Sequence, residues 1–127
     1  MLTCLRVRNF AIIEELEVEL GARLNIVTGE TGAGKSILVD ALQLVLGARG
    51  RPDVVRTDAD SAEVEALFEL DSDSSTAAAL QAQGIETGTE LLIRRVVTAS
   101  GRTRAYINGR LVTLTQLREL TQGLADI

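Results

Sequence analysis

Hydrophobic and polar residues alternate along several stretches of the chain, and this alternation predicts half-buried β-strands. In the first stretch Leu5 and Val7 face one way while Arg6 and Arg8 face the other. Strand-like segments cover residues 1–8, 15–20, 23–28, 63–70, 90–98, 102–108 and 110–112. One polar and one apolar face per strand is typical of antiparallel sheets with a solvated side. Apart from 23–28, these segments predict an antiparallel group of five or six strands.

Three other segments have helical character. Residues 36–46 are apolar nearly all round, except for Asp40 and Gln43, which predicts a helix buried on more than one side. Gly47 stands where a C-terminal cap belongs. Residues 77–83 predict a short helix closed by Gly84. The third helix is expected after a capping box at 113–116, with leucines at 114, 117, 120 and 124 forming one stripe.

Two connections have a clear turn or loop composition. Asn108-Gly109 is typical of a two-residue hairpin, which joins the last two strands. Residues 48–60 contain Gly50, Pro52 and several charges, and we expect them to form a surface loop.

The segment between the strand at 23–28 and the helix at 36–46 reads Gly-Glu-Thr-Gly-Ala-Gly-Lys-Ser, residues 29–36. It fits G-x-x-x-x-G-K-[ST], the phosphate-binding Walker A loop, and it lies between a strand and a helix as that loop requires. Gly29, Gly32 and Gly34 permit the backbone to turn its N–H groups inward around phosphate oxygens. The positive end of the following helix points at the same place.

The motif predicts a site for ATP and Mg²⁺. Lys35 is expected to reach the β- and γ-phosphates, and the Ser36 hydroxyl to be a ligand of Mg²⁺. Lys35 is also the only lysine among the 13 basic residues, and a flexible ammonium fits between phosphates where a planar guanidinium does not. The expected nucleotide-binding residues are Gly29, Glu30, Thr31, Gly32, Ala33, Gly34, Lys35, Ser36 and Ile37.

Composition narrows the function classes. The chain has no histidine and one cysteine, Cys4, which disfavours transition-metal sites, internal disulfides and His- or Cys-based catalysis. No apolar run is long enough for a membrane helix and no secretory signal is visible, so we expect a cytoplasmic location and no membrane partner.

Charge is unevenly distributed. The net charge of −5 argues against nucleic acid coating the whole surface. Residues 91–118 nevertheless carry six arginines and no acid. Two interpretations stay open: solvated side chains, or a DNA-contacting face made by Arg94, Arg95, Arg102, Arg104 and Arg110.

Arginines in the loop after the Walker A helix are a further candidate group. Arg49, Arg51 and Arg56 are either solvated, or one of them returns to the phosphates or reaches a partner's site. Arg56 is the favoured candidate for a catalytic role beside Lys35, because Val54-Val55 could anchor it on a short strand.

The sequence lacks the carboxylates that a hydrolysing P-loop enzyme needs after an apolar strand. The nearest segment, 66–71, is interrupted by Glu69, and no signature loop is found. We therefore expect the first half of a site that residues outside this sequence complete.

Three segments resemble the RecN family of bacterial SMC-like ATPases of DNA double-strand-break repair and recombination: NFAIIEE at 9–15, GETGAGKSILVDA at 29–41 and GRTRAYING at 101–109. The resemblance implies an α/β fold, namely the N-terminal lobe of an ABC-type P-loop ATPase head with an antiparallel sub-sheet, spanning residues 1–127. It also implies that a coiled coil and a C-terminal lobe with the remaining catalytic groups lie outside this sequence.

The resemblance further implies partners and roles. Two heads would form a homodimer around ATP, with each C-terminal lobe completing the other's site, and DNA would be bound by the full protein, nucleoid-associated when acting. The adenine base would lie near residues 9–13, with Asn9 as the candidate binding residue. Arg56 matches an arginine that follows the Walker A helix in SMC-like heads. Two alternatives remain: a DEAH-type helicase or other P-loop motor, which requires a parallel sheet, and a non-catalytic nucleotide-gated scaffold.

Overall fold

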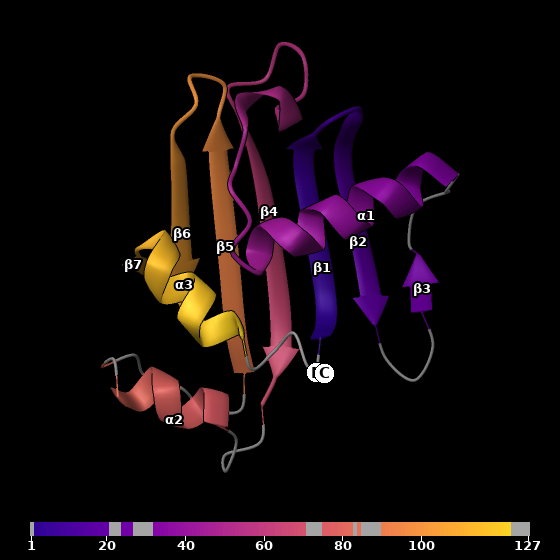
Figure 1. The fold of residues 1–127 in the computed structure, drawn as a ribbon. Coiled ribbons are helices and arrows are strands. Elements are labelled where there is room, and N and C mark those ends of the chain that lie inside the picture. The colour runs from indigo at the N-terminus through magenta and orange to yellow at the C-terminus, as the bar shows by residue number, and fades with distance from the viewer. Residues whose placement is uncertain are drawn as a thin grey trace.

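A seven-stranded sheet forms the body of the molecule, which we describe from a computed structural model covering residues 2–20, 24–26, 32–70, 75–82, 84 and 90–122. The strand order is β3-β2-β1-β4-β5-β6-β7 (Figure 1). The strands are β1 (Leu2–Phe10), β2 (Ile13–Leu20), β3 (Leu24–Ile26), β4 (Ser61–Glu69), β5 (Glu90–Thr98), β6 (Thr103–Ile107) and β7 (Arg110–Val112). Every neighbouring pair is antiparallel, which confirms the expected antiparallel character. The strand before the Walker A motif is not separate from this group: β3 pairs with β2 at the edge of the same sheet.

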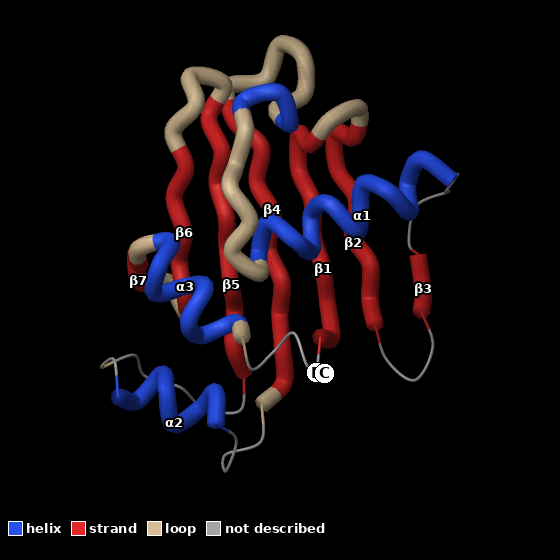
Figure 2. Tube along the Cα trace, in the orientation of Figure 1, coloured by secondary structure: helices blue, strands red, loops and turns tan. Residues whose placement is uncertain are grey.

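The helices are α1 (Gly32–Val45), α2 (Ser75–Ala82) and α3 (Leu114–Thr121), with a short 3-10 turn, η1 (Pro52–Val54), between α1 and β4. Helices α1 and α3 lie on the same face of the sheet, and α1 crosses β1, β4 and β5 obliquely (Figures 1 and 2). Helix α1 begins at Gly32, inside the Walker A motif and earlier than its apolar pattern alone indicated. In the described part of the chain, no helix covers the opposite face of the sheet.

Strand register explains why the covered face is apolar. Val7 of β1 lies opposite Val64 of β4, so aliphatic side chains of adjacent strands form rows beneath α1. Helix α1 adds Ala41, Leu44 and Val45 to this core, and all three are buried. The uncovered face carries the alternate residues, most of them charged.

Arg95 is the exception in the core. It faces α1 and is 0% exposed, whereas the adjacent Arg94 faces the other way and pairs with Glu63. Of the two interpretations left open, the one in which Arg94, Arg95, Arg102, Arg104 and Arg110 form a single DNA-contacting face is therefore excluded, and Arg95 is not a solvated side chain either. Strand alternation sends neighbouring arginines to opposite faces of the sheet, and a buried guanidinium cannot contact DNA.

Three capping and turn signals are confirmed. Gly47 has φ 108° and ends α1, with its N–H donating to the Leu44 carbonyl and that of Ala48 donating to the Gln43 carbonyl, as in a Schellman motif. Thr113 and Gln116 form both hydrogen bonds of the capping box of α3. Asn108 and Gly109 have φ 51° and 82°, the left-handed values that a two-residue hairpin of this type needs.

Candidate nucleotide-binding end of the sheet

The Walker A motif lies between β3 and α1, as the sequence predicts. Strand β3 ends at Ile26 and α1 begins at Gly32. Gly29, Glu30 and Thr31 lie outside the described residues, and of residues 32–36 only the helical backbone is described. The expected contacts of the Lys35 and Ser36 side chains thus remain predictions. Ile37 is 8% exposed and belongs to the core, so its side chain is not available to a ligand.

The end of α1 at the motif has the properties of an anion site. A 14-residue helix begins there and has no acidic residue in its first turn. The first N–H groups of a helix have no partner within it, and they coincide with the positive end of the helix dipole. A phosphate group at this end would satisfy both features.

The other end of α1 is held by basic side chains. The Arg95 guanidinium donates to the carbonyl oxygens of Leu44 and Ala48, at 2.6 and 2.9 Å, and to Thr103 Oγ1 at 2.7 Å. Arg118 Nε of α3 donates to the Gly47 carbonyl at 2.8 Å, and Thr121 Oγ1 donates to that of Leu46 at 2.8 Å. Cations suit this end because its carbonyls are the negative end of the dipole. Strand β5 and helix α3 thereby fix the orientation of the helix that bears the motif.

Burial affects the charge of Arg95 directly. It lowers the pKa of Arg95 to about 10, with a further contribution from the positive charge of Arg118. Arg95 therefore stays charged at neutral pH, although its Nε has no hydrogen-bond partner among the described residues.

Two residues outside the motif, Asn9 and Arg56, were also predicted to belong to the site. They lie side by side in the structure. The Arg56 N–H donates to the Asn9 carbonyl at 2.8 Å, and the Ala11 N–H donates to the Val54 carbonyl at 2.6 Å. Between them Phe10 forms an isolated β-bridge with Val55. Val54 ends the 3-10 turn and Val55 makes only this single bridge, so the short strand expected at Val54-Val55 is reduced to one bridge residue before Arg56.

The strand that ends near Asn9 runs in the same direction as the strand that leads to the motif. Strands β1 and β3 are both antiparallel to β2. Ile26, the last residue of β3, pairs with Val18, which also pairs with Leu5, so β1 continues beyond the end of β3 before it reaches Asn9, upward in Figure 1. Ile12, within the segment 9–13 that is expected near the adenine base, is 78% exposed in the β1–β2 turn. Its exposure was not predicted from the sequence, where it is an apolar residue that breaks the strand alternation.

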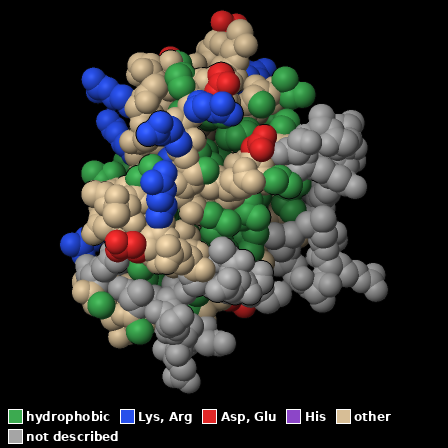
Figure 3. Space-filling model, in the orientation of Figure 1, with side chains coloured by type: hydrophobic (Ala, Val, Ile, Leu, Met, Phe, Trp, Pro, Cys, Tyr) green, Lys and Arg blue, Asp and Glu red, His purple; other side chains and the backbone are tan. Residues whose placement is uncertain are grey.

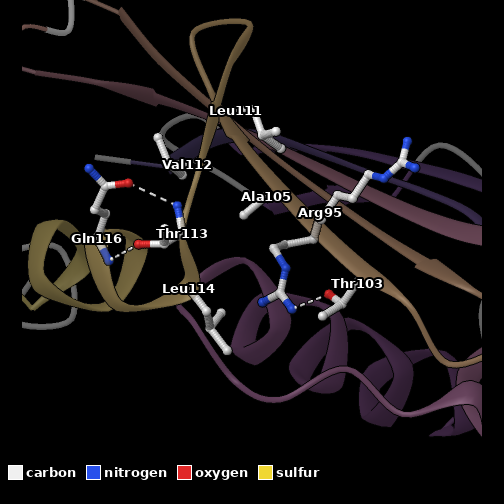
Figure 4. A pocket seen from close by; sticks show the side chains of 9 residues that line it. Arg95, Thr103, Ala105, Leu111, Val112, Thr113, Leu114 and Gln116 are labelled. Atoms are coloured by element: carbon white, nitrogen blue, oxygen red, sulfur yellow. Dashed lines mark hydrogen bonds between the residues drawn. The ribbon is translucent and has the colours of Figure 1, made fainter.

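Two cavities among the described residues lie away from this end. One, of about 380 Å³, lies between β6, β7 and the start of α3, and its lining includes Arg95, Thr103, Leu111 and Gln116 (Figure 4). The dashed bonds in that view join Thr113 to Gln116 and Arg95 to Thr103, so these four polar side chains are already paired. The second, of about 170 Å³, lies on the uncovered face and is lined by Cys4, Arg6, Glu65, Leu67 and Leu92. Neither cavity contains a residue of the predicted nucleotide site.

Two negative findings apply to the described ranges. No group of three or more cysteine, aspartate and glutamate side chains there is arranged to hold a metal ion. In the same ranges, no helix combines the length and the apolar character needed to cross a membrane.

Comparison with known proteins agrees with this geometry. The model of a family described as an AAA domain matches residues 4–124. The DNA repair protein RecN of Bacillus subtilis is 44% identical over 128 aligned residues, which cover 100% of this chain and 22% of that protein. The chain thus spans less than a quarter of the length of the curated relative.

Solved structures show the same fold. An SMC ATPase, studied for ATP-driven dimerisation and DNA-stimulated activation, superimposes with a TM-score of 0.73 at 22% identity, covering 98% of this chain and 79% of that one. The SMC head domain from Thermotoga maritima gives a TM-score of 0.63 at 26% identity, covering 93% of this chain and 41% of that one. The fold is that of the N-terminal lobe of an ABC-type, SMC-like ATPase head, and the chain belongs to the AAA domain family, within which it is similar over its whole length to RecN.

Proposed function

We propose that this chain is the ATP-binding lobe of an SMC-like ATPase that acts in DNA double-strand-break repair and recombination. The observation that carries the proposal is the placement of Gly-Glu-Thr-Gly-Ala-Gly-Lys-Ser, residues 29–36, between the edge strand β3 and the first turn of α1. A strand, a glycine-rich loop and a helix in this order offer backbone N–H groups and a helix dipole to a triphosphate.

Residues 29–37 would surround the phosphates. The Lys35 ammonium would neutralise the β- and γ-phosphates, and Ser36 would complete the coordination of Mg²⁺. Asn9 and the neighbouring β1–β2 turn would face the adenine base. Arg56, whose N–H donates to the Asn9 carbonyl, would approach the phosphates or the site of a second head.

Hydrolysis requires groups from outside this chain. Strand β4 is the candidate closest in sequence to a carboxylate-bearing catalytic strand, but Glu63 and Glu65 alternate with buried residues and face away from α1. In a longer protein that contains this chain, a C-terminal lobe would supply the missing carboxylates. ATP would then drive the association of two heads into a homodimer. The chain by itself is expected to bind ATP without turning it over.

The alternative functions are less well supported. A DEAH-type helicase or other P-loop motor requires a mainly parallel sheet, whereas all described strand pairs are antiparallel. A non-catalytic scaffold gated by nucleotide predicts ATP binding without hydrolysis even in the natural protein.

The deciding experiment measures Mg²⁺-ATP affinity by titration calorimetry for the chain and for Lys35→Ala. Loss of the only ammonium group at the phosphates should weaken binding by tenfold or more, which corresponds to about 1.4 kcal/mol. Lys35→Arg should not restore affinity, because a planar guanidinium does not fit between the phosphates. Arg8→Ala, on the uncovered face of the sheet, is the control and should bind ATP normally. Equal affinities for Lys35→Ala and the unaltered chain would reject the proposal.

A further inference from the structure

A strap of chain runs from the end of α1 into η1 and carries arginines along its length. Residues 47–52 of this strap follow the end of α1 closely and lie over β5 and β6. A Cβ on Gly50 would lie 2.7 Å from Val97 Cγ2 and 3.3 Å from Thr103 Oγ1, so the strap lies directly on those strands. A Cβ on Gly101, in the β5–β6 turn, would be 3.7 Å from Pro52.

These contacts gather four exposed arginines. Arg49 and Arg51 belong to the strap, Arg102 adjoins the β5–β6 turn, and Arg118 reaches Gly47 from α3. Figure 3 shows blue side chains clustered on this face, mostly in its upper left half. We name Arg49, Arg51, Arg102 and Arg118 the strap arginines.

Few negative charges offset this group. Arg51 lies 3.9 Å from Asp53, with both side chains largely exposed, and Glu119 follows Arg118 in α3. Arg49 and Arg102 have no ion pair or side-chain hydrogen bond with the described residues. Arg95 adds a buried charge beneath the strap, with its Nη2 3.6 Å from the position of a Gly50 Cβ. Its hydrogen-bond partners are all neutral, so its charge is not cancelled locally.

The arginines on the uncovered face of the sheet differ from the strap arginines in how many acidic side chains lie next to them. There the arginines of β1 and β5 alternate with glutamates of β2 and β4: Arg6 lies opposite both Glu17 and Glu65, and Arg94 opposite Glu65. Arg6 and Arg94 on that face form ion pairs with Glu17 and Glu63, whereas the exposed Arg104 of β6 has no ion pair with the described residues. The strap group therefore gathers four exposed arginines, with Asp53 as the only acid that forms an ion pair with them among the described residues, in a chain whose net charge is −5.

We propose that the strap arginines bind the phosphate backbone of DNA. This inference rests on the proposed function for its partner, and it assigns that partner a surface separate from the nucleotide-binding residues. Guanidinium groups bind phosphate oxygens in a bidentate manner, and the strap offers a row of them on rigid support. Contacts of this kind position DNA without reading its sequence.

The test uses the natural protein with ATP and Mg²⁺ present. Arg49→Gln, Arg51→Gln and Arg102→Gln are combined, while Arg118 is kept because it also holds α1. Binding of a fluorescent duplex is measured by anisotropy across a salt series. Each lost phosphate contact should reduce the slope of log K against log salt by about 0.9, so the triple variant should show a visibly flatter dependence. The triple variant should lose the same DNA affinity for two duplexes of unrelated sequence, because phosphate contacts do not read sequence.

A charge-matched control is provided by Arg8→Gln, Arg6→Gln and Arg94→Gln combined, which removes the same charge from the uncovered face. This variant should keep the slope of the unaltered protein. The DNA proposal is overturned if the strap variant retains both slope and affinity, or if the control loses as much; the strap would then serve another acidic partner or none. ATP affinity is measured in parallel, so failure of the nucleotide assignment is seen separately as absent ATP binding in the unaltered protein.

Discussion

Two adjacent arginines, Arg94 and Arg95, lie on opposite faces of strand β5 and differ in burial and in their hydrogen-bond partners. Arg95 is buried under α1 and binds neutral oxygen atoms, whereas Arg94 is partly exposed and binds Glu63, with its guanidinium carbon 5.3 Å from the centre of the Tyr106 ring. Among the described residues, the covered face thus holds one fully buried charge, whose removal should cost much unfolding free energy. The uncovered face holds several partly exposed charges, and the removal of each should cost little. The comparison teaches that the position of a charge relative to α1 decides its importance more than the residue type does.

The physical reason lies in solvation. A buried cation loses its hydration, and only well-placed acceptors offset that cost. Helix α1 supplies them because its last carbonyls have no partner within the helix. On the uncovered face water remains, so ion pairs there are screened and individually weak.

The largest expected effect comes from removing the buried cation. Arg95→Met keeps the apolar stem but removes the charged donor of three hydrogen bonds, to the Leu44 and Ala48 carbonyls and to Thr103 Oγ1. The Leu44 carbonyl keeps the Gly47 N–H as a donor. Because a hydrogen bond to a charged group contributes about 1.5–3 kcal/mol, the loss should be about 2–5 kcal/mol. Arg94→Met, the matched variant on the uncovered face, should cost about 1 kcal/mol or less. Urea unfolding of both variants, followed by circular dichroism, makes the comparison. Equal losses would break the contrast between the two faces.

An intermediate effect is expected at the end of α1. Gly47 has φ 108°, and a Cβ there would lie 2.6 Å from Arg118 Cγ, so Gly47→Ala combines backbone strain with a collision. Gly109→Ala is the control, because Gly109 also has positive φ, 82°, but has no atom within 4 Å of the added Cβ. The left-handed backbone should cost each variant about 1–2 kcal/mol. Overpacking should add about 1–3 kcal/mol at Gly47 alone.

Equal unfolding free energies for the two glycine variants would mean that Arg118 moves aside freely, and hence that α3 does not hold α1. A larger loss of unfolding free energy for Gly47→Ala would mean that Arg118 is held in place, and hence that the contact between α1 and α3 on the covered face is rigid. Both values come from the same urea titrations.

Local features of this fold could be predicted from the sequence because they depend on neighbours in the chain. The alternation of the strands, the Asn108-Gly109 hairpin, the capping box at Thr113 and the glycine at the end of α1 are of this kind. The fate of Arg95 was not predictable in the same way. Alternation with Ile93 and Val97 places it inward, but only the carbonyls of α1, distant in sequence, make a buried guanidinium tolerable.

The candidate site also combines features that local sequence predicts with features that depend on contacts between distant segments. The motif at 29–36 was predictable from residue types and spacing alone, since loop chemistry imposes both. The contact between Asn9 and Arg56 was suggested only separately, by resemblance and by the apolar pair Val54-Val55. It depends on a long-range backbone pairing that no local pattern encodes. The strap arginines were likewise scattered in the sequence, and the packing of Gly50 on β5 and β6 unites them.

The smallest expected effect tests the uncovered face through its pH dependence. Burial by itself raises the pKa of the Glu63 carboxyl, but the hydrogen bond and charge of Arg94, with a hydrogen bond from Glu65, outweigh it and hold that pKa below its usual value. For Glu65, burial and then the hydrogen bond with Glu63 raise the pKa. A carboxyl whose pKa is lowered on folding stabilises the fold above its unfolded-state pKa, about 4.3, and this contribution disappears as pH falls through the folded-state value.

Glu63→Gln should therefore lower the unfolding free energy at pH 7 by about 1 kcal/mol or less, and the difference from the unaltered chain should shrink as the pH is lowered below about 4. Urea titrations at several pH values measure it. The same substitution made in the Arg94→Met chain isolates the pair, because the acid-dependent part requires both partners. If that part persisted without Arg94, the ion pair would not be its cause, and the hydrogen bond with Glu65 and the charge of Arg8 would account for it instead.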